Sequence, residues 1–173
     1  MAAGGAAPVV SLRAARAADA PALARLFAAS RRAAMPWLPV LWTAEQERAW
    51  MAGAVLPACE VTVAEAEGGA PVGFVARRGE WIDHLYLAPG WWRRGVGSAL
   101  LEAAAADGGE DAPPALRLRA FARNAAARAF YERHGFRAVA ESDGSDNEER
   151  EPSVLYERPR PRDSRGPTGG TTR

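Results

Sequence analysis

The sequence predicts one domain of mixed α/β class, and three observations lead to this prediction. The chain has 173 residues, 48% of them hydrophobic, which is enough for one compact core and short for two ordinary domains. Helical and strand patterns alternate between residues 9 and 158 without an internal repeat. Within that alternation, residues 80–121 run strand, helix, strand, which predicts a parallel crossover in a single sheet.

In the first half of the chain, turn and capping residues separate two helices from three strands. Pro21 follows Asp19 at the start of a run with apolar residues on one face, which is typical of a helix N-terminus. Thr43 and Gln46 have the spacing of a capping box, and the glycine pair at 68–69 divides two strand-like runs as a hairpin turn does. The expected elements are a strand at 9–15, a helix from Asp19, an irregular aromatic loop at 35–42, a short helix from Thr43 to about Ala54, and strands at 59–66 and 71–78.

The second half predicts two more helices and four more strands. A glycine-containing turn at 95–97 opens one helix, which the loop DGGEDAPP ends from Asp107 onward. Asn124 is a good N-cap and Gly135 a good helix stop, so the second helix lies between them. The expected elements are strands at 80–87, 116–121, 136–141 and 153–158, helices at 95–106 and 124–134, and an acidic loop at 141–152.

The charge balance argues against a large polyanionic partner. The formal net charge is +1, so no overall basic field favours nucleic acid or a membrane surface, and we expect neither as a partner. The sequence contains no run of 18 apolar residues and no signal-peptide pattern, and its single cysteine allows no internal disulfide. These features predict a soluble cytoplasmic protein.

Both ends of the chain have compositions typical of disordered tails. Residues 1–8 and 159–173 are rich in small residues, proline and arginine, and they contain little that a core could bury. The domain is therefore expected to span residues 9–158. The arginines of the second tail could contact nucleic acid, but a solvated tail is the commoner behaviour of such a segment.

The run WWRRGVGSAL places Gly95 and Gly97 where a helix begins. The first amides of a helix have no partner within it and lie at the positive end of its dipole, so phosphate or pyrophosphate suits them. Arg93 and Arg94 add positive charge, although a plain strand-to-helix turn is the alternative for an isolated Gly-x-Gly. A Walker loop is excluded because the chain has no lysine, and a dinucleotide fingerprint is disfavoured because Leu100 stands where a third small residue is needed.

Two stretches of the sequence resemble motifs of the GNAT (GCN5-related) N-acetyltransferase superfamily. HLYLAPGWWRRGVGSALL is similar to the acetyl-CoA-binding motif, a strand followed by Gln/Arg-x-x-Gly-x-Gly/Ala and a helix. NAAARAFYERHGF is similar to the later motif, in which Asn, Ala, Tyr and a terminal Gly-Phe recur. The resemblance extends in strand order from about Val9 to Arg158, and it departs from the pattern at Trp92, which stands at the Gln/Arg position.

The resemblance implies a central mixed, mostly antiparallel sheet with flanking helices, with acetyl-CoA as the acyl donor and no metal. The strand before the glycine turn would diverge from the strand after the helix, so that its backbone groups pair with the pantetheine arm. The pyrophosphate would lie on the helix N-terminal amides, and Asn124, also an N-cap, would lie with Tyr131 near the thioester. The implied binding residues are Leu85, Tyr86, Leu87, Arg93, Arg94, Gly95, Val96, Gly97, Ser98, Asn124 and Tyr131.

Acetyl transfer from a thioester to an amine needs a base for the ammonium, a site for the oxyanion and a proton for the departing thiolate. Asp83 is the first candidate for the base, directly or through water, because strand alternation places it on the face of Leu85. Glu80, His84 and water itself are the alternatives. A backbone N–H of the diverging strand serves the oxyanion, and Tyr131 is the candidate acid because a phenol can protonate a thiolate.

The acceptor is expected to be a primary amine of a small molecule or a peptide. Its expected contacts are Trp37, Asp83, Asn147 and Glu148, with core packing as the alternative for Trp37. If the acidic loop is more than a solvated hairpin, its carboxylates favour a cationic acceptor. A non-catalytic acyl-CoA-binding module is the alternative function, and the oligomeric state stays open, a homodimer included.

Overall fold

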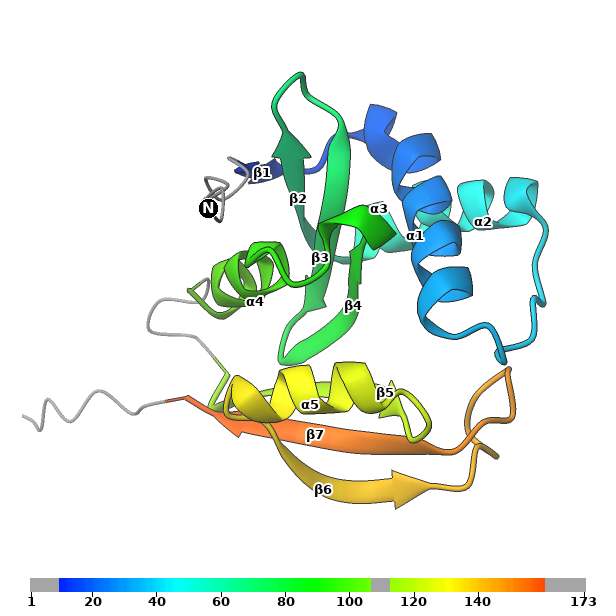
Figure 1. The fold of residues 1–173 in the computed structure, drawn as a ribbon, viewed down its shortest axis with the longest axis vertical. Coiled ribbons are helices and arrows are strands. Elements are labelled where there is room, and N and C mark those ends of the chain that lie inside the picture. Colours follow the sequence, from blue (N-terminus) through cyan, green and yellow to red (C-terminus); the bar gives the residue numbers. More distant parts are fainter. Residues whose placement is uncertain (1–9, 107–112, 161–173) are drawn as a thin grey trace, which may run out of the picture.

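The elements of the computed structural model, which describes residues 10–106 and 113–160, follow the predicted order (Figure 1). Most of both expected tails and residues 107–112 lie outside the described residues. The strands are β1 (Val10–Ala14), β2 (Glu60–Ala66), β3 (Pro71–Arg78), β4 (Trp81–Leu87), β5 (Ala115–Phe121), β6 (Arg137–Ser142) and β7 (Ser153–Pro159). The helices are α1 (Ala20–Ala34), α2 (Ala44–Trp50), α3 (Leu56–Ala58), α4 (Val96–Ala106) and α5 (Ala125–Arg133).

A single sheet of seven strands forms the centre of the molecule, in the order β1-β2-β3-β4-β5-β7-β6 (Figure 1). Neighbouring strands are antiparallel except for β4 and β5, which are parallel and are joined through α4. This is the crossover that the strand-helix-strand pattern predicts. The mixed, mostly antiparallel sheet with flanking helices is therefore confirmed, whereas the insertion of β7 between β5 and β6 was not foreseen.

Helices cover both faces of the sheet and bury a separate core on each (Figure 1). On one face, Phe27 of α1 and Phe74 of β3 belong to one buried cluster, and each lies against the ring of Tyr86. On the other face, Leu100 of α4 and Tyr131 of α5 belong to the same buried cluster as Val75 of β3. Because successive strand residues point to opposite faces, the central strands supply apolar side chains to both cores.

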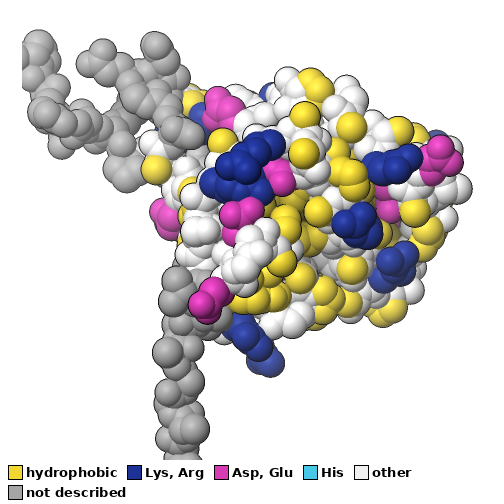
Figure 2. All heavy atoms as spheres, turned by 90° about the horizontal axis from the view of Figure 1, so that it is seen from above, with side chains coloured by type: hydrophobic (Ala, Val, Ile, Leu, Met, Phe, Trp, Pro, Cys, Tyr) yellow, Lys and Arg dark blue, Asp and Glu magenta, His cyan; other side chains and the backbone are white. Residues whose placement is uncertain are grey.

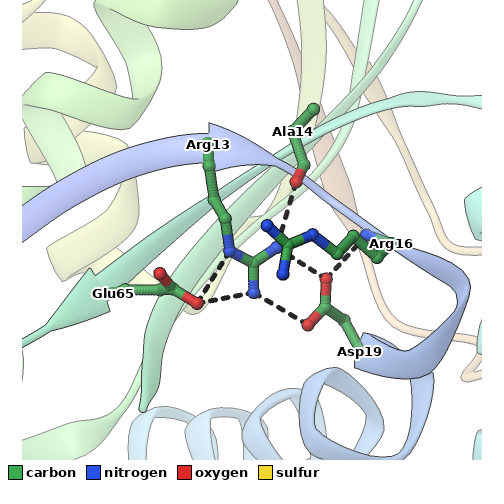
Figure 3. Close-up of polar contacts among 5 residues, drawn as sticks. All are labelled: Arg13, Ala14, Arg16, Asp19 and Glu65. Carbon is green, nitrogen blue, oxygen red and sulfur yellow. Dashed lines mark hydrogen bonds and ion pairs between the residues drawn. The ribbon is translucent and has the colours of Figure 1, made fainter. Parts of the chain in front are cut away.

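Polar contacts of Arg13 fix the edge strand β1 to its surroundings (Figure 3). Its Nε donates to the carboxylate of Glu65 on β2 at 2.7 Å, and its Nη1 donates to the carboxylate of Asp19 at 2.7 Å. The backbone N–H of Arg16 donates to the same Asp19 carboxylate at 2.6 Å. Hydrogen bonding from Arg13 lowers the pKa of Asp19, so the carboxylate stays charged well into the acid range. The edge of the sheet thus depends on a charged cluster as well as on apolar packing.

The segment from Thr43 to Ala58 stays helical beyond the predicted end near Ala54. The capping box is confirmed: Thr43 Oγ1 accepts from the Gln46 N–H at 3.2 Å, and Gln46 Oε1 accepts from the Thr43 N–H at 2.8 Å. After α2 the chain makes a wide helical turn over Met51–Val55 and continues into α3. Met51 is 0% exposed and Val55 is 3% exposed, so this turn packs into the core under α1. Burial of that face explains why the helical path continues.

The surface carries charges of both signs. Figure 2 shows one face on which arginine and acidic side chains lie close to one another among hydrophobic side chains. Ten ion pairs with one arginine each occur among the described residues. In the described part of the chain, no helix has the length and hydrophobicity needed to cross a membrane.

Candidate active site

The strands β4 and β5 separate soon after they meet. Their described residues pair at a single register position, Trp81 with Arg117, and the Arg117 N–H donates to the Glu80 carbonyl at 2.8 Å. Beyond that point the backbone of β4 still pairs with β3, for example Leu85 with Val75, while its other edge faces the opening. Unpaired strand edges are able to bind an extended ligand as an added strand. The opening therefore has the geometry that the diverging strands were expected to have.

A β-bulge at Asp83 changes which face each β4 residue occupies. Ala76 pairs with His84 and Arg77 with Ile82, so Asp83 is the extra residue between them. Strict alternation would place Asp83 on the same face as Leu85. Because of the bulge, Ile82 lies in the core with Leu85 instead.

The Asp83 carboxylate is directed instead toward the start of β2 and the end of β3. Cys59 Sγ donates to its Oδ2 at 3.7 Å, and Arg78 Nε donates to the same oxygen at 3.1 Å. The Asp83 side chain is 22% exposed, while the Arg78 side chain is 63% exposed. The parity argument for Asp83 as the base is therefore corrected, although Asp83 still lines the opening between the strands.

A cavity of about 230 Å³ lies in the opening between β4 and β5. Leu85 and Tyr86 of β4 line it from one side, and Tyr131 of α5 and the N-cap residue Asn124 line it from the other. Asn124 Oδ1 accepts from the Ala127 N–H at 3.1 Å, so this residue caps α5 as predicted. Four of the residues expected near a thioester are thus brought together in one cavity.

Two phenols, Tyr131 and Tyr86, lie at this cavity. Burial raises the pKa of Tyr131, and the neighbouring Tyr86 raises it further. Burial also raises the pKa of Tyr86, against the opposing effect of the Arg31 guanidinium beside it. Both phenols are therefore protonated throughout the neutral range and are available as hydrogen-bond donors.

The turn before α4 contains two glycines, and glycine suits each position for a different structural reason. Gly95 has φ of +82°, a conformation that favours glycine, and a Cβ built there would meet no atom within 4 Å. A Cβ on Gly97 would lie 3.1 Å from Leu87 Cδ1 and 3.4 Å from the Phe130 ring. Gly95 thus leaves open space beside the first amides of α4, whereas Gly97 permits close packing of the helix.

The residues around this turn make contacts that bear on anion binding. Arg93 and Arg94 are exposed, and the Arg94 guanidinium lies 5.5 Å from the centre of the Trp91 ring. Trp92, at the position where the superfamily pattern has Gln or Arg, donates from its indole Nε1 to the Leu87 carbonyl at 3.2 Å. That carbonyl, one of the groups expected to pair with a pantetheine arm, is therefore already a hydrogen-bond acceptor.

Ser98, in the first turn of α4, is joined to the end of α5. Its Oγ lies 2.9 Å from His134 Nε2, and His134 Nδ1 lies 2.8 Å from the Phe130 carbonyl. Since a carbonyl only accepts, Nδ1 carries a proton and donates it there. The contact orients the Ser98 hydroxyl beside the first amides of α4.

A second and larger cavity, of about 490 Å³, lies between the α1–α2 segment and the loop from β6 to β7. Phe27, Trp42 and Trp50 contribute aromatic walls, together with His84 from β4. Burial lowers the pKa of His84 to about 4, so its imidazole is neutral at pH 7. Met35 and Asn147 line both this cavity and the smaller one, so the two cavities are neighbours.

The acidic loop from β6 to β7 is held by basic and polar partners. Arg31 Nη2 lies 2.5 Å from Glu149 Oε1, and Trp42 Nε1 donates to Glu148 Oε2 at 3.0 Å. Asp146 and Glu151 form ion pairs with arginines on β5 and in the turn that follows it, respectively. Three of the loop carboxylates, Asp146, Glu149 and Glu151, are thus paired with arginines, which weakens the basis on which the sequence favoured a cationic acceptor, whereas Glu148 is bonded by a neutral indole and keeps its charge.

Three expected acceptor contacts from these loops have different environments. Glu148 lines the larger cavity, and Asn147 lines both cavities while its amide group also bonds the Glu151 backbone. Trp37 lines neither described cavity. Its ring is half-buried and belongs to neither core; it lies edge-on to Phe121 at 6.0 Å, with the Arg123 guanidinium 4.3 Å from its centre.

Sequence reasoning missed two groups that line the cavities, the Arg31 side chain of α1 and the phenol of Tyr86, of which only the backbone was expected to take part. Arg31 and the Tyr86 phenol have no recognisable motif, because their importance comes from contacts with residues far along the chain. The aromatic content of the loop at 35–42 was a signal for an apolar wall, and Trp42 fulfils it. In the described ranges, no group of three or more His, Cys, Asp or Glu side chains is arranged to hold a metal ion.

Comparisons with known proteins agree on one family. The sequence model of the Acetyltransferase (GNAT) domain matches residues 57–138, which include the glycine turn and the α5 motif. Among the curated proteins, none matches the sequence.

Solved structures provide a longer match. The solution structure of apo YjaB from Escherichia coli is 28% identical, with a TM-score of 0.70, and the match covers 86% of this chain and 97% of that one. A GCN5-related N-acetyltransferase from Rhodopseudomonas palustris is also 28% identical, with a TM-score of 0.68, over 89% of this chain and 96% of that one. The PaiA N-acetyltransferase from Thermoplasma acidophilum, in complex with coenzyme A, shares the fold at 16% identity and a TM-score of 0.67, over 88% and 99% of the two chains.

Proposed function

Because this chain belongs to the GNAT acetyltransferase superfamily, we propose that it moves an acetyl group from acetyl-CoA to a primary amine. The observation that carries the proposal is the opening between β4 and β5. There Tyr131 of α5 and the N-cap residue Asn124 face Leu85 and Tyr86 of β4 across one cavity. A thioester lying along β4 would present its carbonyl in this cavity, where an amine can reach it from the larger cavity beside it.

Binding of the donor would use the backbone more than the side chains. The amides from Arg93 to Ser98 offer donors for a pyrophosphate, and the open space beside Gly95 leaves room for it. The exposed Arg93 and Arg94 would add charge at the rim of this site. The open edge of β4 would then pair with the pantetheine arm as an added strand.

In the proposed reaction the amine nitrogen attacks the thioester carbonyl, a C–N bond forms and the C–S bond breaks. A backbone N–H of Leu85 or Tyr86 would stabilise the negative charge that develops on the carbonyl oxygen. Tyr131 would donate its phenolic proton to the departing sulfur, since burial raises the pKa of the phenol and keeps it protonated at neutral pH.

The base would be Asp83, acting through water. Its carboxylate is engaged by Arg78 and Cys59, so a direct contact with the amine is less favourable than a relay. Of the alternatives, Glu80 is held by Arg117 at 3.1 Å, and His84 in the larger cavity is a weak base because burial lowers its pKa to about 4. The single free cysteine supports a reducing compartment, and we place the protein in the cytoplasm.

Release of free thiol from acetyl-CoA, measured across a panel of amines, tests the proposal. Amine-dependent release and a matching acetylated product are expected. Tight binding of acetyl-CoA without release in any mixture would instead identify a non-catalytic acyl-CoA-binding module. Calorimetry on the same samples separates that outcome from a protein that does not bind acetyl-CoA at all.

A further inference from the structure

We propose that the acceptor is a small arylalkylamine, in which a short chain joins the primary amine to an aromatic ring. This inference rests on the proposed function, since the acetyl group must come from the neighbouring opening between β4 and β5. It concerns the cavity of about 490 Å³ between the α1–α2 segment and the loop from β6 to β7, which we call the acceptor cavity.

The wall of the acceptor cavity is built from rings that contact one another. Trp50 lies 5.2 Å from Phe27 and 5.1 Å from His84, measured between ring centres, and the Trp50–His84 pair is edge-to-face. Phe27 and His84 are also edge-to-face, at 6.2 Å. Such a cluster leaves ring faces and edges to pack against a further aromatic ring.

The rim of the cavity is apolar as well. Val40, Leu41 and Trp42 are 71%, 48% and 43% exposed, and all three line the cavity. Consecutive large apolar side chains at the rim of a concave site are typical of ligand-binding grooves. An aromatic acceptor would cover them, whereas a small polar amine would leave them in water.

Most charged side chains at the acceptor cavity have partners within the protein. Glu149 is paired with Arg31, and Glu148 accepts from Trp42. The other two charged lining residues, Arg32 and Glu47, are one of each sign. The charged lining residues together leave one net negative charge, because the indole that bonds Glu148 is neutral, so the cavity suits a single ammonium group better than a polyamine with two or more.

Arg31 also lies where the two cavities meet. Its guanidinium is 5.0 Å from the Phe27 ring centre in the acceptor cavity and 6.0 Å from the Phe121 ring centre in the smaller one. Met35 and Asn147 line both cavities at this junction. A ring in the acceptor cavity with a short alkylamine would place its nitrogen in the smaller cavity, which Tyr131 lines.

The size and closure of the cavity favour a small molecule over a peptide. The two walls are joined by the Arg31–Glu149 ion pair and by the hydrogen bond from Trp42 to Glu148. Figure 1 shows the loop from β6 to β7 beside the chain that follows α1, in agreement with these contacts. A peptide continuing beyond its N-terminal residue would have to displace these bridges, whereas a one-ring or two-ring amine fits within the cavity volume.

The test compares kcat/KM for 2-phenylethylamine and tryptamine with ethylamine, spermidine and a short polar peptide with a free N-terminus. Burial of one aromatic ring predicts kcat/KM about tenfold to a hundredfold higher for the aryl amines than for ethylamine. Spermidine and the peptide are expected to fall near or below ethylamine. Values for either that equal those of the aryl amines would overturn the inference.

Variants at Trp42 separate the role of its ring from that of its hydrogen bond. Trp42→Ala removes both and should reduce the preference for aryl amines over ethylamine about fivefold or more, while Trp42→Phe loses the hydrogen bond but keeps an aromatic ring and should retain most of the preference. Val139→Ala is the control, because Val139 is 54% exposed on β6 and lines neither cavity. Equal selectivity in all three variants would remove Trp42 from acceptor binding and contradict the aromatic cavity.

Failure of this inference can be told apart from failure of the proposed function. If spermidine or the peptide is acetylated best, the transferase function stands and the aryl acceptor does not. If no amine increases thiol release, the proposed function fails. Calorimetric titration of 2-phenylethylamine and ethylamine into the CoA-saturated protein then decides the preference of the cavity without turnover, and equal or absent binding of the two overturns it.

Discussion

The neutral state of His84 predicts a specific loss of stability in acid. An unfolded histidine has a pKa near ~6.5, whereas burial lowers the pKa of folded His84 to about 4. Arg31 and Arg78 lower it further, and Asp83 opposes them. Between these two values the unfolded chain binds a proton that the folded chain excludes, so the free energy of unfolding falls as the pH falls from 6.5 toward 4.

The size of this effect follows from the two pKa values. A shift from ~6.5 to about 4 corresponds to roughly 3 kcal/mol once the pH lies below both pKa values, and to about 2 kcal/mol between pH 7 and pH 5. His84→Phe keeps a ring among Phe27, Trp50 and Tyr86 but cannot be protonated. The variant should therefore lose about 2 kcal/mol less than the wild type over the same pH interval, because the other acid-sensitive groups are common to both.

Urea unfolding at pH 7 and pH 5 measures the difference. With an m-value of about 2 kcal/mol/M, the wild-type midpoint should move down by about 1 M more than that of His84→Phe. His134, the other of the two histidines, supplies the control as His134→Gln, which should retain the wild-type pH response of His84. Equal losses in the wild type and His84→Phe would mean that folded His84 takes up a proton as readily as the unfolded chain, and the reasoning from burial would be refuted.

Three further predictions follow from the site and the fold. Tyr131→Phe should reduce turnover roughly 10²-fold to 10⁴-fold with little change in acetyl-CoA affinity, and undiminished turnover in a folded variant, where chemistry limits the rate, would exclude Tyr131 as the acid. Arg93→Gln with Arg94→Gln should weaken acetyl-CoA binding about tenfold in calorimetry and reduce its salt dependence, whereas unchanged affinity would restrict the anion site to the backbone amides. Asp19→Asn should lower the free energy of unfolding by about 1–2 kcal/mol at pH 7 and by less at pH 3, because an unfolded aspartate with a pKa near ~3.9 takes up a proton at pH 3 more readily than the folded carboxyl, so the wild type loses stability that the variant has already lost; an equal difference at both pH values would contradict this.

The sequence by itself determined most of the secondary structure of this protein. Thr43 and Asn124 cap their helices as their spacing predicts, and Gly95 adopts the positive φ that a tight turn before α4 requires. These features depend on residues within a few positions of one another, which is the range over which capping and periodicity act. The crossover of β4, α4 and β5 follows from the same local order together with the handedness of such units.

The composition of the cavities was decided by the tertiary structure. One extra residue in β4 turned Asp83 away from the face that alternation predicts, because register in a sheet depends on the partner strand. The acidic loop looked free to select a cation until the fold placed Glu149 against Arg31, which is 118 positions away. His84 likewise became a neutral cavity residue through its contacts with two helix residues, Phe27 and Trp50. Charge compensation and burial depend on which distant side chains meet, and local spacing along the chain does not contain that information.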